Sequence, residues 1–466
     1  MSDRQGGATF TEGSVGRHLL RLGSFITMGS LSMNFARLVE AVYLGWIGTE
    51  ALAALGFAFP VTIALFAFAG GIGTGASSVI ARSVGSGDGE RAAILVTHAQ
   101  LLVLVVGIII GLLGFWYAEA VITALGATGQ VREMAADYLT VYMFGFPLFM
   151  LSMVGSTLLR ATGRAASPGI VMTTGSVLQM AFGPVLIFGW FGLPALGIAG
   201  AAWAYVLSRV FSVAIYLALL SRARMIRLSV KGFWRSFVAI VHVGGPATAS
   251  GLIQPVSMLI MTRLLAAHGH EVVAGYNVAM RVETMVHMVL WGASSSIGPF
   301  VGQNWGAGQF QRARQALSLS NRFCLAWGLV TFVVLFLGGD YFVRLIDDNE
   351  TVGAVARMFF LIVPLSIGFM GVMQVASTCF NALGRPAPPL IIALLRTFVM
   401  YVPIAILANS VWGYPGVFAA TALTNVVMGT VAWEWNRRAV RSGSSLSQQE
   451  SSAEFGDRNV DRVTSS

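Results

Sequence analysis

Two acidic residues lie inside long apolar stretches of this chain, where a charge is costly. Glu40 follows Leu38 and Val39, and Glu283 lies in the stretch Arg281-Val-Glu-Thr284. A charged side chain at bilayer depth costs about 2.5–3.5 kcal/mol on insertion scales, so each glutamate is a candidate functional group. A carboxyl group in apolar surroundings can take up and release a proton near neutral pH. Each residue is therefore a candidate for taking up a cation, and Glu283 could instead sense a cationic substrate.

Each glutamate also has a structural interpretation. Arg37 precedes Glu40 by three residues and shares its helical face, so the two could form an ion pair that keeps the carboxylate charged. The same pair could instead be the switch itself, if a movement of the protein separates it. Glu283 could form an ion pair with Arg281 or Arg263. The sequence leaves these alternatives open.

Polar residues elsewhere in the apolar stretches are candidates for lining a cleft or touching a substrate. Amide side chains inside membrane helices form hydrogen bonds between helices just as readily. The candidates are Asn34, Arg37, Gln179, Gln254, Asn277 and Gln374.

Residues for metal, cofactor or nucleotide chemistry are not expected. The two cysteines, Cys324 and Cys379, have no metal-ligand spacing, and the loop Gly85-Ser-Gly-Asp-Gly89 lacks the Lys-Ser/Thr of a nucleotide-binding loop. The six histidines are scattered, which disfavours a membrane-embedded enzyme. We therefore expect a protein that is not an enzyme and has no cofactor other than a coupling ion.

The elements that must position these residues are membrane helices. The chain is 56% hydrophobic and 11% charged, with a mean hydropathy of +0.75, whereas soluble domains carry about 25% charged residues. Apolar runs approach the ~20 residues that span a bilayer. They predict twelve helices, at 17–46, 52–80, 93–116, 134–158, 168–189, 197–220, 237–266, 272–300, 316–338, 354–380, 388–409 and 414–435.

Charge alternates between successive loops, and this alternation predicts the orientation. One set of loops contains most of the arginines, and the other contains Glu119, Glu133, Glu271 and Glu350 with few basic residues. Basic loops stay in the cytoplasm. We expect a multi-pass protein of the plasma (inner) membrane with both termini cytoplasmic, and the net charge of +9 needs no nucleic-acid partner. Its partners would be membrane lipid and small amphipathic or cationic molecules, and we expect a monomer.

The chain repeats itself at an offset of 221 residues. Arg164 in Arg160-Ala-Thr-Gly-Arg164 corresponds to Arg385 in Asn381-Ala-Leu-Gly-Arg385, and Gly85 and Gly87 correspond to Gly306 and Gly308. Two six-helix halves in the same orientation are related by an axis along the membrane normal, as in transporters that rock about a central site. The predicted division is a polar tail 1–14, an N lobe 15–220, a basic linker 221–236, a C lobe 237–440 and a disordered tail 441–466.

Four motifs resemble the multidrug and toxic compound extrusion (MATE) family. They are Leu38-Val-Glu-Ala-Val-Tyr-Leu-Gly45, Leu159-Arg-Ala-Thr-Gly163, Gly197-Ile-Ala-Gly-Ala-Ala-Trp-Ala204 and Pro299-Phe-Val-Gly-Gln-Asn-Trp-Gly-Ala-Gly308. The resemblance covers about residues 15 to 440. It implies an all-α membrane fold of the MOP superfamily, with about twelve helices in two lobes related by a pseudo-two-fold axis. It also implies an antiporter that exports organic, often cationic, compounds in exchange for H⁺ or Na⁺ by alternating access.

One position departs from the family pattern and affects the choice of ion. The resemblance assigns the coupling acid of the first helix to Glu40. In the fifth helix many relatives carry Asn and, four residues later, Asp; this chain has Gln179 and Gly183. A sodium site with paired carboxylates is therefore less favoured than a single proton. The alternative function is a flippase for lipid-linked saccharides, which would need more basic residues in its cleft.

Overall fold

The protein is built from helices alone in the part that the structure describes. The computed structural model describes residues 10–227, 229–344 and 349–464, with the side chains of 340, 343–344 and 442–464 excepted. The helices are α1 (Val15–Ile47), α2 (Thr49–Gly85), α3 (Gly89–Ala124), α4 (Gly129–Phe144), α5 (Phe146–Ala161), α6 (Ser167–Ile187), η1 (Trp190–Gly192), α7 (Gly197–Arg222), α8 (Phe233–Ala266), α9 (His270–Gly306), α10 (Phe310–Arg344), α11 (Glu350–Ile362), α12 (Pro364–Ala382), α13 (Ala387–Leu394), the π-helix η2 (Leu395–Tyr401), α14 (Val402–Trp412) and α15 (Tyr414–Thr464).

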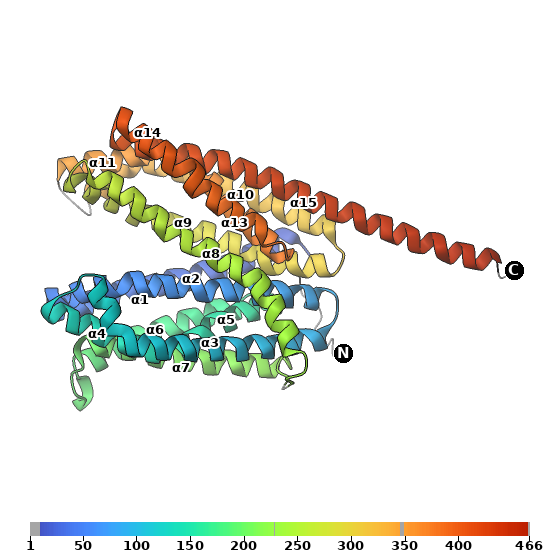
Figure 1. Ribbon diagram of the computed structural model, residues 1–466, viewed down its shortest axis with the longest axis horizontal. Helices are drawn as coiled ribbons and strands as arrows, with labels where there is room; N and C mark the ends of the chain where they lie inside the picture. The colour runs from blue at the N-terminus through green and yellow to red at the C-terminus, as the bar shows by residue number, and fades with distance from the viewer. Residues whose placement is uncertain (1–9, 228, 345–348, 465–466) are drawn as a thin grey trace.

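These helices form two lobes, as the repeat predicts. Figure 1 shows α1–α7 packed together as an N lobe, and α9–α15 as a C lobe that lies across it. The helix α8 starts against the N lobe, where Ile240 joins its core, and crosses to the C lobe. The lobes approach each other at the end that carries the N terminus and diverge toward the other end. We call the first the basic end, because its turns and helix ends carry Arg82, Arg91, Arg160, Arg164, Arg312 and Arg385.

The twelve predicted spans each coincide with one helix or with one broken run of helices, so the predicted fold class is confirmed. In the described part, nine helices are long and apolar enough to cross a membrane, and the bent pair α4–α5 makes ten. The other two spans, α1 and α9, have 33 and 37 residues and carry the buried glutamates. The protein is therefore a multi-pass membrane protein.

Three of the predicted spans are interrupted or bent. The fourth bends by 55° between α4 and α5, next to Pro147. The tenth breaks at Pro364, and the eleventh contains the π-helix η2 just before Pro403. Proline lacks a backbone N–H and its ring clashes with the preceding turn, so breaks and kinks concentrate there.

Glycines allow the two lobes to touch at backbone distance. A methyl group added to Gly75 of α2 would lie 2.7 Å from the backbone nitrogen of Gly244, and closer still to the carbonyl oxygen of Ile240 on α8. A methyl group on Gly85 would overlap the backbone of Gln303 on α9. Small residues permit this close approach of membrane helices. The lobe contact therefore depends on positions that have no side chain.

The segment before α1 also joins the lobes, although the sequence predicted only a polar tail. Phe10 is 1% exposed, and its backbone N–H donates to Oε1 of Gln303 at 3.2 Å. Its carbonyl oxygen accepts from Asn304 at 3.1 Å and from Arg312 at 3.0 Å. Residues 1–9 of that predicted tail lie outside the described residues. From Phe10 onward the segment fastens the start of α1 to α9 and α10.

The glycine contact predicts how the lobe equilibrium responds to a methyl group. Gly85→Ala should shift the population away from contact at the basic end by about five- to 150-fold, because overpacking costs about 1–3 kcal/mol. The shift would be measured by electron–electron resonance between spin labels at Ser86 and Arg385, which are exposed on the two lobes. Gly56→Ala in the same helix is the control, since nothing lies within 4 Å of that position. Equal distance distributions for both variants would contradict the packing argument.

Candidate functional site

The buried carboxylate of Glu40 is held by two neutral donors from other helices. The residue lies on α1 and is 9% exposed. The hydroxyl of Tyr138 on α4 donates to Oε1 at 3.0 Å, and the amide of Gln179 on α6 donates to Oε2 at 3.2 Å. The two predicted residues Glu40 and Gln179 are thus brought together. Each carboxylate oxygen has a partner, as a buried polar group requires.

A row of tyrosines continues from this carboxylate into the N lobe. Tyr138 stacks on Tyr142, with ring centroids 6.3 Å apart, and Tyr142 stacks on Tyr205 at 4.9 Å. The hydroxyl oxygens of Tyr142 and Tyr205 are 3.4 Å apart. The guanidinium of Arg209, which is 4% exposed, lies 4.8 Å from the Tyr205 ring centroid. A buried cation therefore stands at the far end of the row from Glu40.

Arg37 does not form the ion pair that was one alternative for Glu40. Among the described residues no ion pair within 4.0 Å joins the two side chains. The Arg37 guanidinium instead lies 5.8 Å from the centroid of the Phe66 ring on α2, and its side chain is exposed. It is still near enough to act electrostatically on Glu40. In this conformation the carboxylate is stabilised by hydrogen bonds from neutral donors rather than by a contact cation.

The ring of Tyr43 lies against Gly183, the position where the family resemblance implies a second acid. A side chain at Gly183 would begin 2.9 Å from that ring, so Tyr43 fills the space that a longer residue would need. The remaining cavity beside Glu40 has a volume of about 10 Å³ and is lined by Glu40, Tyr43, Gln179 and Gly183 among others. That is about the lower limit for one water molecule. The site is too small and too poor in oxygens to resemble a multidentate metal site.

The second predicted acid has a different environment. Glu283 on α9 is 8% exposed, and the charge that acts on it is Arg396 of η2. Among the described residues, Glu283 forms no ion pair within 4.0 Å with its expected partners, Arg281 and Arg263. One turn along α9, Nε2 of His287 lies 2.6 Å from the amide nitrogen of Gln374 on α12.

Arg396 is anchored by a polar chain across the C lobe. Its Nη2 donates to Oδ1 of Asn425 at 2.9 Å, and Asn425 donates to the Ser366 hydroxyl at 3.0 Å. The π-helix that carries Arg396 is a rare conformation that concentrates at functional sites. The carboxylate of Glu283 therefore has Arg396 at a distance and, within the described residues, accepts no hydrogen bond, whereas the carboxylate of Glu40 accepts two.

The other predicted cleft residues form no hydrogen bond with either acid within the described part of the chain. Asn34 donates to the carbonyl oxygen of Ser30 at 3.0 Å and contacts Sδ of Met288 at 3.8 Å, across the lobe boundary. Gln254 on α8 and Asn277 on α9 are exposed and have no hydrogen bond within the described part of the chain. Their role in lining a cleft stays a prediction.

Sequence reasoning missed the hydroxyl and ring partners of the two acids. Tyr138 and Tyr142 were not singled out, although a spacing of four residues inside an apolar helix places both on one face. His287 lies four residues after Glu283, so the same spacing places these two residues on one face of their helix. The partners Tyr205, Ser366 and Asn425 come from distant helices, and no local pattern indicates them.

Comparison with known proteins now fixes the family. The family model called MatE matches residues 26–185 and 246–407, one segment in each lobe. The chain belongs to the MatE family. This confirms the resemblance to multidrug and toxic compound extrusion proteins, whose members are transporters. The two matched segments also agree with the internal repeat.

The relatives of this MatE-family chain extend over almost its full length. A Shewanella oneidensis protein named FAD transporter is 31% identical over 437 residues, which cover 93% of this chain and 96% of that protein. A Bacillus subtilis protein named probable multidrug resistance protein YoeA is 24% identical, covering 89% and 93%. The structure of the Vibrio cholerae MATE transporter VcmN in the bent form matches with a TM-score of 0.87 and 26% identity, covering 92% of this chain and 98% of that one.

The hydrogen bond from Tyr138 predicts a change in the pH profile of transport. Tyr138→Phe keeps the ring but removes one of the two donors that stabilise the ionised carboxylate. The pH of half-maximal transport should move upward, by about one to two pH units for a hydrogen bond to a charged group of about 1.5–3 kcal/mol. Tyr142→Phe is the control, because Tyr142 has no hydrogen bond to Glu40 within the described chain. An unchanged profile in Tyr138→Phe would show that the bond does not hold the charge.

Proposed function

We propose that this transporter is a secondary antiporter that exports organic compounds in exchange for protons, with Glu40 as the group that carries the proton. The observation that supports the proposal is the pairing of Glu40 with Tyr138 and Gln179. Both partners are neutral donors, and among the described residues no cation is in contact with the carboxylate, so protonation breaks no ion pair. Each acid has an arginine that acts on it only at a distance, but Glu283 accepts no hydrogen bond within the described part of the chain, and for this reason it is the weaker candidate.

The same geometry favours a proton over sodium. A hard metal cation takes about six oxygen ligands, whereas the Glu40 carboxylate faces two donor groups and a cavity of about 10 Å³. Within the described residues no group of three or more His, Cys, Asp or Glu side chains could hold a metal ion. A proton needs only the carboxylate oxygen itself.

The orientation follows from the charges. The basic end contains the arginine-rich loops, and we place it, with both termini, on the cytoplasmic side of the plasma membrane. The lobes are then in contact toward the cytoplasm and apart toward the outside. Rocking of the lobes would close the space between them toward the outside and open it to substrate from the cytoplasm. Protonation of Glu40 would bias that equilibrium by changing its bonds to α4 and α6.

The substrate has two candidate classes. Relatives named as multidrug resistance proteins favour an amphipathic, often cationic, compound. The relative named FAD transporter favours a flavin nucleotide, an aromatic anion. The exposed guanidinium of Arg37 beside the Phe66 ring offers both a positive charge and an aromatic contact. This pairing suits an anionic aromatic substrate better than a simple cation.

The proton-coupling role is tested in proteoliposomes with Glu40→Gln. The amide keeps the size of the side chain but cannot exchange a proton, so transport driven by a pH gradient should fall by about tenfold or more, as for loss of an interaction of ~1.4 kcal/mol. Transport of a cationic dye and of FAD would be followed under an imposed pH gradient and, separately, a sodium gradient. Unimpaired pH-driven transport by Glu40→Gln would rule out the assignment.

The matched control is Glu283→Gln, which removes the other buried carboxylate. This variant should still respond to the pH gradient, although its rate can change. If Glu283→Gln loses the response and Glu40→Gln keeps it, the coupling acid lies in the C lobe. If only the sodium gradient drives the wild type, the proton proposal is wrong.

A further inference from the structure

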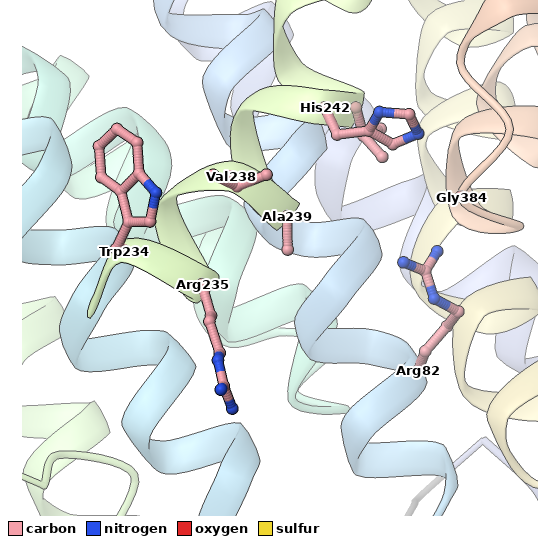
Figure 2. A pocket seen from close by; sticks show the side chains of 8 residues that line it. Arg82, Trp234, Arg235, Val238, Ala239, His242 and Gly384 are labelled. Atoms are coloured by element: carbon pink, nitrogen blue, oxygen red, sulfur yellow. The ribbon is translucent and has the colours of Figure 1, made fainter. Parts of the chain in front are cut away.

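A cavity at the basic end lies where α2, α8 and the turn between α12 and α13 meet. Its volume is about 440 Å³, within the range of small-molecule sites. Figure 2 shows Arg82 reaching from α2 toward the turn at Gly384, and His242 of α8 extending toward the same turn; Trp234, Arg235 and Val238 of α8 also line the cavity. The cavity is distant from Glu40, since α1 and α2 carry the two sites at opposite ends. It serves neither of the acids discussed above.

The polar groups of the cavity are basic. Its lining contains two arginines and a histidine and no acidic side chain. Nη1 of Arg82 donates to the Ser78 hydroxyl and to the carbonyl oxygen of Ala382, each at 2.7 Å. Within the described chain, Nε and Nη2 of Arg82 and the side chains of Arg235 and His242 have no hydrogen-bond or ion-pair partner.

Nearby carboxylates do not cancel this charge. Glu90 forms an ion pair with Arg227 at 2.8 Å. Asp88 accepts from the backbone N–H of Arg91 at 2.9 Å and caps α3. The donors of the cavity therefore remain available for an anion, and guanidinium groups match the geometry of phosphate oxygens.

An apolar strip extends from the cavity along α8. Trp234, Val238 and Val241 follow one another at helical spacing and are 70%, 49% and 41% exposed. The Trp234 ring stacks on Phe237 with centroids 4.9 Å apart. Tryptophan near a helix end marks the membrane–water interface. A free phosphate ion would leave this strip uncovered, whereas an acyl chain would lie along it.

The cavity is complete only while the lobes touch. Arg82 belongs to the N lobe, and its guanidinium lies so close to Gly384 of the C lobe that a methyl group there would be 2.9 Å from Nη1. Gly384 has a φ of +76°, a conformation that glycine adopts without strain. A ligand bound here would therefore stabilise the conformation with lobe contact at the basic end.

We propose that this cavity binds the phosphate headgroup of an anionic membrane lipid. Arg82, Arg235 and His242 surround the phosphate, and the acyl chains lie along the strip of α8. Basic pockets between membrane helices bind anionic headgroups in this way. The lipid acts as a ligand of the lobe-contact state, whichever compound the protein transports.

The test counts lipids retained by the intact protein in native mass spectrometry, with phosphatidylglycerol and phosphatidylcholine offered in equal amounts. The wild type should retain one phosphatidylglycerol in preference to phosphatidylcholine. Arg235→Gln should lower that retention about tenfold, the effect of one charge-assisted hydrogen bond. Arg82→Gln should do the same. Arg235 has no part in the lobe contact, so its variant separates lipid binding from a change in folding.

The matched control is the double variant Arg222→Gln/Lys231→Gln, which removes two exposed charges of the same linker region that do not line the cavity. It should retain phosphatidylglycerol like the wild type. An equal loss in this control, or no loss in Arg235→Gln, overturns the proposal. A third arm adds millimolar inorganic phosphate. If phosphate displaces phosphatidylglycerol with an affinity equal to that of the lipid, the site recognises free phosphate and the lipid assignment is overturned.

Discussion

The burial of one carboxyl group in the N lobe constrains the rest of the site. A charge at this depth costs about 2.5–3.5 kcal/mol, and two hydrogen bonds to a charged group return about 1.5–3 kcal/mol each. The hydrogen bonds can therefore offset the cost of burying the charged form of Glu40 without a contact cation. A contact ion pair with Arg37 would remove that balance in favour of the charge. Because the Arg37 guanidinium lies over the Phe66 ring instead, the Glu40 carboxyl group can still exchange a proton.

This balance is useful only if it is tied to a movement of the lobes. The donors of Glu40 come from α4 and α6, so the protonation state changes how α1 is held within the N lobe. The helix α1 is also fastened to the C lobe, through Phe10 at its start and Asn34 near its middle. A change at Glu40 therefore acts on a helix that both lobes share. The glycine contacts at Gly75 and Gly85 make the lobe interface a close fit rather than a deformable one.

Much of the fold could be predicted from the sequence, because the bilayer imposes a simple rule. Every spanning segment must be a long apolar helix, so all twelve spans were found, and the repeat of Arg164 at Arg385 gave the two lobes. The breaks at Pro147 and Pro364 were visible as prolines, but whether a membrane proline kinks or breaks a helix depends on its neighbours. The π-helix around Arg396 has no sequence signal of its own.

The site was predictable only in part, for a related reason. A charged residue is energetically costly inside an apolar stretch, so Glu40 and Glu283 could be recognised from the sequence alone. Their partners depend on which helices pack together, and Tyr138 is 98 positions away from Glu40. The expected pairings used arginines of the same helix, Arg37 and Arg281, or of the preceding helix, Arg263. The actual neighbours of Glu40 and Glu283 lie on helices that are distant in the sequence, and residue spacing does not indicate which helices pack together.

The most direct test of proton exchange is to record internal pH and substrate flux together in sodium-free proteoliposomes that contain the wild-type protein. With a gradient of the transported compound as the only driving force, the account predicts a proton flux in the opposite direction that starts with the substrate and stops when it is exhausted. Substrate flux with no movement of protons would contradict it.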